Sequence, residues 1–268
     1  MVPFRHRLIY NALRKELSKN SIKITDRILV VCGGDFDRTV LMDLNFENVT
    51  ISNLDTRMKG DEFHPYAWSF QDAEDIKFDN DTFDWVIVHA GLHHCYSPHR
   101  ALLEMLRVGK LGAIVIESRE SFTMKLAIKL GLTDNYEIQA VIGNHLKYGG
   151  VANTFVPNFV YRWTEKEVIK LVCCQYPQFA DNKVDFHYGL RIPYGRIEFE
   201  KSNLKRLILH LAFLPLKLYA FLFPKQSNEF GFVIRKGATL QQWLEVENGK
   251  LKLNMEYLEA NYDTTVRK

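Results

Sequence analysis

The sequence predicts an α/β protein built on a doubly wound, mostly parallel seven-stranded sheet. Between residues 27 and 118, short β-branched apolar runs alternate with amphipathic segments, as expected for βαβ units. A glycine pair directly follows the first run, and an acid closes the second. The chain has 268 residues, 47% of them hydrophobic, so it can form one large domain or one domain with a modest cap.

The first strand is expected over residues 28–31, a β-branched run too short for a buried helix. The glycines at 33–34 break it, and Asp35 or Asp37 can cap the helix that follows. The next strand covers residues 49–54. The inner face of the helix between these strands carries Val40, Leu41 and Leu44.

Asp55 stands roughly 20 residues after the glycine turn, a spacing typical of the nucleotide-binding half of a doubly wound sheet. In such a unit the glycines let the backbone approach the ligand, and the acid accepts hydrogen bonds from ribose hydroxyls. The stretch therefore indicates a nucleotide site. A glycine turn with a purely structural role explains the same residues, and that alternative stays open at this point.

The later strands place more polar groups at the same edge of the sheet. Residues 68–72 can form a short third strand that leads into the acidic segment 72–75. Residues 83–89 (FDWVIVH) have the pattern of a buried strand, and they run into a loop over 90–96. Open α/β sheets bind ligands at such carboxyl ends.

The helix after this loop has clear boundaries. Ser97 and Pro98 are a typical N-cap and first-turn pair, and Gly109 ends the helix. A fifth strand follows over residues 113–117. The buried face of the helix carries Ala101, Leu102, Met105 and Leu106.

Composition bears on the partners, the compartment and the metal content that we expect for this protein. The net charge of +3 gives no indication of a nucleic-acid partner. The four cysteines show no paired spacing, which favours a reducing compartment, and we expect a cytoplasmic protein. A metal site built from His93, His94 and Cys95 is weighed and set aside, because adjacent side chains in a loop point in different directions. We therefore expect no metal.

Two helical additions flank the sheet pattern. Residues 1–26 contain an amphipathic helix that either docks on the domain or forms a lid over a ligand site, and they lack the uncharged apolar core of a signal peptide. Residues 204–224 are apolar but interrupted by charges and Pro215, short of the ~20 apolar residues that a membrane span needs. We consider a packed cap, peripheral membrane contact, or a homodimer interface. The apolar stripe of the first helix consists of Ile9, Leu13 and Leu17.

The segment after residue 117 is expected to begin with a helix over 118–132. An insertion or mobile lid over about 135–158 follows. Thr164 and Glu167 predict a capping box. The apolar face of the helix they cap carries Val168, Ile169, Leu171 and Val172. Two further strands are expected, over residues 184–192 and 230–235. A helical tail is expected over residues 239–268.

Residues 27–118 resemble the core of class I S-adenosylmethionine-dependent methyltransferases, in particular the type 11-like group. In that family a Phe-Asp strand leads to a loop that often ends in His-His, and a helix with Glu and Arg-Val precedes a Lys-Pro-Gly-Gly-like turn. The matching residues here are Phe83, Asp84, His93, His94, Glu104, Arg107, Val108 and residues 110–113. The resemblance implies a Rossmann-like methyltransferase fold with S-adenosylmethionine as cofactor.

The resemblance also implies roles for individual residues. Asp55 would hold the ribose diol and Asp72 the adenine amino group. The implied cofactor-binding residues are Cys32, Gly33, Gly34, Asp35, Leu54, Asp55, Asp72, Ala73, Glu74, His89, Ala90 and Gly91. The sequence departs from the family at the glycine loop, where acid-x-Gly-x-Gly-x-Gly is usual. Only Gly34 falls on a glycine position, and Asp35 or Asp37 can take over the ammonium of the methionine moiety.

The histidine pair is the candidate for chemistry. A hydroxyl acceptor must lose a proton, and histidine titrates near neutral pH without large perturbation. His93 and His94 lie in the loop after the fourth strand. Because neighbours in an extended loop point to opposite sides, we expect only one to face the acceptor, and we favour His94. Alternatively, both histidines shape the loop and proximity supplies the catalysis.

These residues favour methyl transfer to oxygen on a small or lipid- or sugar-linked acceptor. The Asn-Pro-Pro-Tyr-like motif of enzymes that methylate amide or base nitrogens is absent after Val88. An NAD-dependent oxidoreductase would also use Gly34 and Asp55, but it does not explain the segment around Asp72. A catalytically inactive cofactor-binding module is compatible with the altered glycine loop, and a membrane-surface scaffold would rest on residues 204–224 alone.

Overall fold

The computed structural model describes residues 7–191, 203, 207, 211 and 213–264. Its centre is a seven-stranded sheet of order β3-β2-β1-β4-β5-β7-β6. Neighbouring strands from β3 to β5 run parallel, and β7 lies antiparallel between β5 and β6, which confirms the predicted fold class. The strands are β1 (Arg27–Val31), β2 (Asn48–Asn53), β3 (Ala67–Phe70), β4 (Phe83–His89), β5 (Gly109–Ser118), β6 (Lys183–Gly189) and β7 (Glu229–Arg235).

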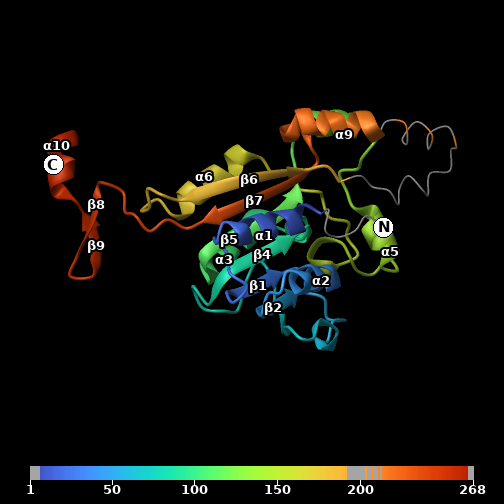
Figure 1. The fold of residues 1–268 in the computed structure, drawn as a ribbon, viewed down its shortest axis with the longest axis horizontal. Helices are drawn as coiled ribbons and strands as arrows, with labels where there is room; N and C mark the ends of the chain where they lie inside the picture. The colour runs from blue at the N-terminus through green and yellow to red at the C-terminus, as the bar shows by residue number, and fades with distance from the viewer. Residues whose placement is uncertain (1–6, 192–202, 204–206, 208–210, 212, 265–268) are drawn as a thin grey trace.

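Helices cover both faces of this sheet (Figure 1). Alternate residues of β1 enter opposite cores, Leu29 on one face and Val30 on the other. The first core includes residues of α3 (Pro98–Val108) and α6 (Glu165–Gln175), and the second includes residues of α1 (Leu8–Ser18) and α2 (Asp35–Asp43). Burial on both faces is why the parallel strands are continuous apolar runs in the sequence.

The N-terminal helix α1 is docked on the sheet. Ile9 and Leu13 are fully buried in the second core. Glu16, buried on the same helix, pairs with Lys19 at 3.1 Å and with Arg235 of β7. The described part of residues 1–26 therefore contains a helix that is docked on the sheet. Residues 1–6, like parts of the expected segments 184–192 and 204–224, lie outside the described residues.

Three helix starts test the predicted caps. Ser97 Oγ accepts the Arg100 N–H at 3.3 Å, and Thr164 and Glu167 form the predicted capping box. At α2 the prediction is confirmed for Asp37 rather than Asp35: Gly34 occupies the N-cap, and Asp37 Oδ2 in the first turn accepts the Gly34 N–H at 2.9 Å.

Three further predictions are corrected. The helix expected at 118–132 is α4 (Phe122–Lys129), which starts later because β5 extends to Ser118. Ile169, expected on the buried face of α6, is exposed. The expected helical tail contains a hairpin of β8 (Leu244–Glu247) and β9 (Lys250–Leu253), because Asn248 and Gly249 both adopt positive φ in a two-residue turn. Among the described residues of this tail, only α10 (Met255–Asn261) is helical.

The described part of 204–224 contains α9 (Phe213–Leu222), followed by η5 (Pro224–Gln226). Leu214 is 77% and Phe221 79% exposed, so the described residues contradict a packed cap. Within the described residues, we find no helix with both the length and the apolar character that crossing a membrane requires. The insertion over 135–158 contains α5 (Ile138–Gly143) and η4 (Val151–Asn153).

Candidate active site

A narrow cavity lies at the carboxyl ends of the parallel strands. Its lining comprises Cys32, Asn53, Leu54, Gln71, Asp72, Ala73, Glu74, His94, Cys95, Ala152 and Asn153. Six of the predicted site residues are brought together here: Cys32, Leu54, Asp72, Ala73, Glu74 and His94. The cavity measures about 70 Å³, against about 300–1,000 Å³ for typical ligand pockets. Because Ala152 and Asn153 come from η4, the insertion forms one wall of this cavity.

Asp55 lies at the end of β2 beside this cavity and is 6% exposed. Arg57 binds both of its carboxylate oxygens, with Nε 2.9 Å from Oδ1 and Nη2 2.5 Å from Oδ2. The hydrogen bonds from Arg57 lower the pKa of Asp55. The Arg57 guanidinium also lies 3.3 Å from Asn144 Oδ1 and 4.3 Å from the ring centre of Tyr148, so the insertion is linked to this acid.

The acidic segment after β3 forms a tight turn. Asp72 Oδ1 accepts the Glu74 N–H at 2.9 Å. The Glu74 carboxylate accepts the N–H groups of Tyr96 and Ser97 at 2.8 and 2.9 Å. Glu74 therefore fastens the loop after β4 to the segment after β3, and its carboxylate has a structural role.

The glycine turn after β1 is closely packed on one side and open on the other. A Cβ on Gly33 would lie 2.8 Å from Ile51 Cγ2, whereas nothing lies within 4 Å of the corresponding position on Gly34. Asp37 Oδ1 is buried near the turn and has no hydrogen-bond partner among the described residues, although His89 Nδ1 lies 3.7 Å away. Asp35 is 78% exposed at its side chain and pairs with Arg38.

The loop after β1 and the loop after β4 are in close contact at Cys32 and Gly91. Cys32 and Ala90 both adopt positive φ, at 52° and 53°. A Cβ on Gly91 would lie 2.4 Å from the Cβ of Cys32, so glycine is needed where the loop after β4 crosses the loop after β1. His89 stacks on Phe36, with ring centres 4.9 Å apart.

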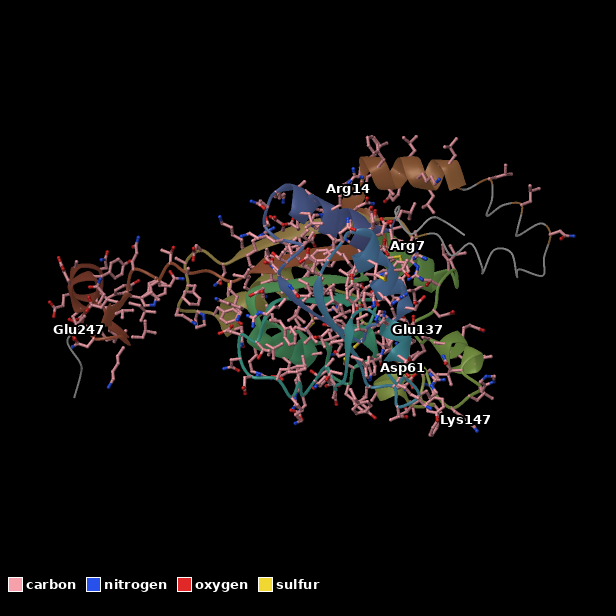
Figure 2. All side chains as sticks on the ribbon, turned by 60° about the horizontal axis from the view of Figure 1, so that its bottom comes forward. Arg7, Arg14, Asp61, Glu137, Lys147 and Glu247 are labelled. Carbon is pink, nitrogen blue, oxygen red and sulfur yellow. The ribbon has the colours of Figure 1, made fainter. Side chains whose placement is uncertain are left out.

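A cluster of imidazoles and carboxylates lies where the insertion meets the loop after β4. His93 Nδ1 is 2.6 Å from Glu117 Oε2, and Glu117 Oε1 accepts the Leu92 N–H at 2.6 Å. Nε2 of His93 and Nε2 of His94 each lie 3.4 Å from Glu137 Oε2. Figure 2 labels Glu137 and, farther along the insertion, Lys147.

The expectation that His93 and His94 point to opposite sides is wrong. Their ring centres are 4.6 Å apart, and both rings meet Glu137. The reason is that the loop is not extended here: residues 92–94 form the short 3₁₀ helix η3 (Leu92–His94). Successive side chains of a 3₁₀ turn are about 120° apart, so a group on one side can contact both.

The cluster shifts the pKa values of the two histidines in opposite directions. Burial lowers the pKa of His93, but Glu117 and Glu137 outweigh it and raise that pKa to about 10. Burial, followed by the charge of His93, lowers the pKa of His94, which keeps its imidazole neutral at neutral pH. Burial raises the pKa of Glu137, yet the two histidines bring it down to about 2.

Sequence reasoning missed Glu117, Glu137 and Arg57. Glu117 lies near the carboxyl end of β5, the position that identified Asp55 at the end of β2, so the same rule could have found it. Glu137 precedes the short helix α5 and carries no motif. It is placed by the base of the insertion, where Tyr136 and Phe159 form an antiparallel bridge.

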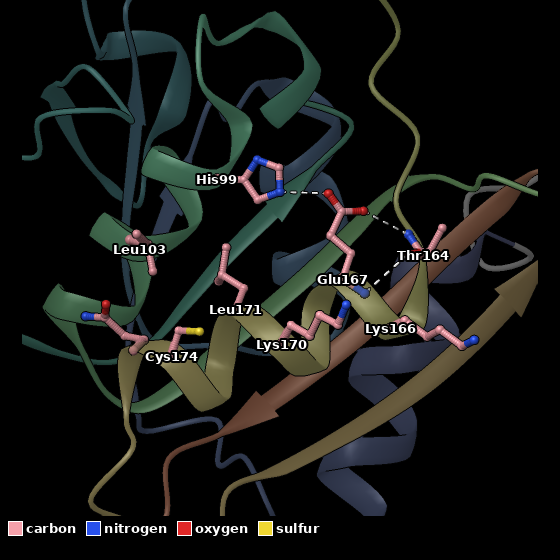
Figure 3. Close-up of a pocket in the computed structure, with 9 residues that line it drawn as sticks. His99, Leu103, Thr164, Lys166, Glu167, Lys170, Leu171 and Cys174 are labelled. Atoms are coloured by element: carbon pink, nitrogen blue, oxygen red, sulfur yellow. Dashed lines mark hydrogen bonds and ion pairs between the residues drawn. The ribbon is translucent and has the colours of Figure 1, made fainter.

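A larger cavity of about 650 Å³ lies between α3 and α6 (Figure 3). His99 Nε2 is 2.7 Å from Glu167 Oε1 in this groove. The groove contains none of the predicted site residues. Its lining comprises His99, Leu103, Thr164, Lys166, Glu167, Lys170, Leu171, Cys174 and Gln175.

Comparison with known proteins finds a family match for part of the chain. The family model of the methyltransferase domain matches residues 27–116. No curated protein matches the chain. The structure is similar to magnesium protoporphyrin IX methyltransferase from Synechocystis PCC 6803, solved with bound S-adenosylhomocysteine, with a TM-score of 0.50, 9% identity, and coverage of 85% of this chain and 82% of that one.

Two further solved structures are similar. The YcgJ protein from Bacillus subtilis has a TM-score of 0.49 and 12% identity, with coverage of 87% of this chain and 99% of that one. Phosphoethanolamine N-methyltransferase 2 from Haemonchus contortus, in complex with S-adenosyl-L-methionine, has a TM-score of 0.46 and 14% identity, with coverage of 86% and 53%.

Residues 27–116 match the methyltransferase domain, and they lie on the sheet expected for class I S-adenosylmethionine-dependent methyltransferases. This match favours the methyltransferase prediction over the alternative of an NAD-dependent oxidoreductase. The residues fit the cofactor chemically, since Asp55 is an acid at the end of β2 and Asp37 offers a buried, unpartnered carboxylate oxygen beside an open glycine turn. The narrow cavity must widen to admit the cofactor, and the wall formed by η4 is the part contributed by the insertion.

Proposed function

We propose that this methyltransferase transfers its methyl group to the oxygen of a hydroxyl acceptor, with His94 as the general base. One observation carries the proposal: His94 lines the same cavity as Leu54 and Asp72, and burial lowers its pKa so that it is a neutral base. A neutral imidazole 3.4 Å from the Glu137 carboxylate can take up a proton, because that carboxylate stabilises the resulting cation.

The proposed cofactor contacts are three acids, of which Asp72 lines this cavity and Asp55 and Asp37 lie outside its lining. When bound, S-adenosylmethionine supplies an electrophilic methyl group on a sulfonium. Asp55 would accept from the ribose hydroxyls, Asp72 from the adenine amino group, and Asp37, rather than the exposed Asp35, would receive the ammonium. By holding the cofactor, these acids would also place its methyl group. Direct displacement requires the acceptor oxygen to be held at attack distance, in line with the bond that breaks.

The experiment is the His94→Gln variant, assayed beside its affinity for S-adenosylhomocysteine. We expect turnover on a hydroxyl acceptor to fall by roughly 10²–10⁴, with cofactor affinity little changed, because the base acts only on the acceptor. Equal losses of turnover and affinity would make His94 a cofactor contact and contradict its role as base. Methylation of nitrogen instead of oxygen would contradict the acceptor class.

We further propose that the acceptor has an apolar body and is reached at a membrane surface. Support comes from exposed apolar side chains on α4 and α9, which meet where Thr123 Oγ1 lies 3.0 Å from the Tyr219 hydroxyl. Because Ser118 pairs with Glu229, both helices attach at the edge where the parallel strands end. The α4–α9 surface consists of Phe122, Leu126, Leu130, Leu214, Leu218, Phe221 and Leu222.

A further inference from the structure

We propose that His93 Nε2, His94 Nε2 and the Glu137 carboxylate form a binding site for a first-row divalent transition metal ion. The site extends the proposed methyl transfer to oxygen. The role of the ion in activating the acceptor hydroxyl rests on that proposed function. The ligand atoms of the three residues all lie within 4.8 Å of one another.

The distances match a coordination site closely. In a tetrahedral zinc site with bonds of about 2.0–2.1 Å, two ligand atoms are about 3.3 Å apart. Both imidazole nitrogens lie 3.4 Å from Glu137 Oε2, so two of the three edges already have that length. Only small side-chain movements are needed for one ion to contact all three residues.

Outer contacts hold the ligands in the orientation that a metal requires. His93 directs Nδ1 at Glu117, 2.6 Å away, which leaves Nε2 for the ion. Glu137 Oε2 accepts from Asn158 Nδ2 at 3.4 Å. Metal-binding histidines are usually held by a carboxylate or a backbone carbonyl at the other nitrogen, and Glu117 is such a partner for His93.

The donor set determines the kind of ion. Two imidazoles and one carboxylate suit Zn²⁺, Co²⁺ or Fe²⁺, whereas Mg²⁺ and Ca²⁺ prefer oxygen donors. Three protein ligands leave at least one coordination position open, as in catalytic sites. Because His94 lines the cavity at the strand ends, the open position can face the methyl acceptor.

The site would change how the acceptor hydroxyl is activated. With the ion bound, His94 is a ligand rather than the base, and coordination of the acceptor oxygen lowers the pKa of its hydroxyl so that the proton passes to water. The insertion supplies Glu137, so metal binding also ties the insertion to the loop after β4. Without an ion, the same residues form the His93–Glu137 ion pair described above.

The test is titration of the chelator-treated protein with Co²⁺ and Zn²⁺, followed by calorimetry and, for Co²⁺, by visible absorption. We expect one equivalent of either ion to bind, an absorption band typical of tetrahedral Co²⁺, and no comparable binding of Mg²⁺. His94→Gln and Glu137→Gln should each weaken binding by at least about tenfold. His99→Gln is the matched control, because it removes a histidine in contact with a glutamate outside the cluster.

Either of two outcomes would overturn the metal site: no stoichiometric binding to the wild type, or unchanged binding in His94→Gln. His94 is 31% exposed at its side chain, so this variant tests the site even where Glu137→Gln fails to fold. Because binding is measured without acceptor or cofactor, a failure here leaves methyl transfer to oxygen with His94 as base intact. Metal binding without any methylation of a hydroxyl would overturn the proposed function alone.

Discussion

Asp55 is the residue on which the adenosine half of the proposed site depends. Its carboxylate is buried at the end of β2, and Arg57 occupies both oxygens. Ribose hydroxyls must therefore share or replace the hydrogen bonds of this guanidinium. Because Arg57 also contacts Tyr148 of the insertion, a movement of this guanidinium would change a contact of the insertion.

We expect Asp55→Ala to bind S-adenosylhomocysteine at least about tenfold more weakly, because a charged acceptor to a ligand hydroxyl contributes about 1.5–3 kcal/mol. Isothermal calorimetry measures the affinity. Asp35→Ala is the control, since that acid lies at the start of α2 and its side chain is 78% exposed. Wild-type affinity in Asp55→Ala would place the ribose elsewhere.

The Asp55–Arg57 pair also predicts a pH dependence. The folded pKa of Asp55 is lowered, so its contribution to the free energy of unfolding is complete above the unfolded value of about 3.9 and is lost as pH falls through the folded value. At pH 7 the free energy of unfolding of the wild type, measured with urea, should exceed that of Asp55→Asn by about 0.5–1.5 kcal/mol. The difference should shrink at the lowest pH where both proteins remain folded. A pH-independent difference would show that the ionised carboxylate is not responsible.

At the scale of elements, local chemistry predicted most of the sheet and its helices. The runs at β1 and β4 could be recognised because both faces are covered, and Ser97 and Thr164 mark helix starts through their own side chains. The failures have different causes. The orientation of His93 and His94 follows from the 3₁₀ helix η3 and from Glu137, which lies more than 40 residues farther along the chain, and no local pattern reports that contact. The hairpin in the tail, by contrast, has a local signal in the Asn248–Gly249 turn.

The α4–α9 surface predicts binding to a membrane surface. We expect the protein to float with anionic vesicles at low salt and less at high salt, because its exposed leucines and phenylalanines insert at the membrane–water interface while nearby lysines contact anionic headgroups. The paired substitution Leu214→Gln/Phe221→Gln should reduce flotation strongly. Val246→Gln/Leu251→Gln, which removes two exposed apolar residues from the hairpin, should not.

The membrane proposal fails if the protein does not float even with anionic vesicles at low salt. Sedimentation velocity on the same samples then separates the remaining interpretations, since a homodimer through this surface would dissociate in Leu214→Gln/Phe221→Gln. Lysines exposed on or beside these helices are Lys125, Lys129, Lys217 and Lys225.

For the whole molecule, the C-terminal hairpin stands apart from the domain. Figure 1 shows β8, β9 and α10 projecting beyond the sheet, and Figure 2 places Glu247 far from the main body. None of the described residues from 243 to 264 is buried. The chain up to residue 242 keeps the contacts that complete the domain, including the Ala180 N–H to the Thr239 carbonyl at 2.9 Å.

We therefore expect a chain ending at residue 242 to unfold within about 2 °C of the full-length protein, because a two-stranded hairpin without a core adds little stability. Leu13→Ala in α1 is the comparison: this side chain is fully buried, and its truncation should cost about 2–5 kcal/mol and lower the midpoint by several degrees. Differential scanning calorimetry measures both. A large loss of stability in the shortened chain would show that the hairpin packs on the domain in solution, and equal midpoints for Leu13→Ala and wild type would contradict the role of α1 in the core.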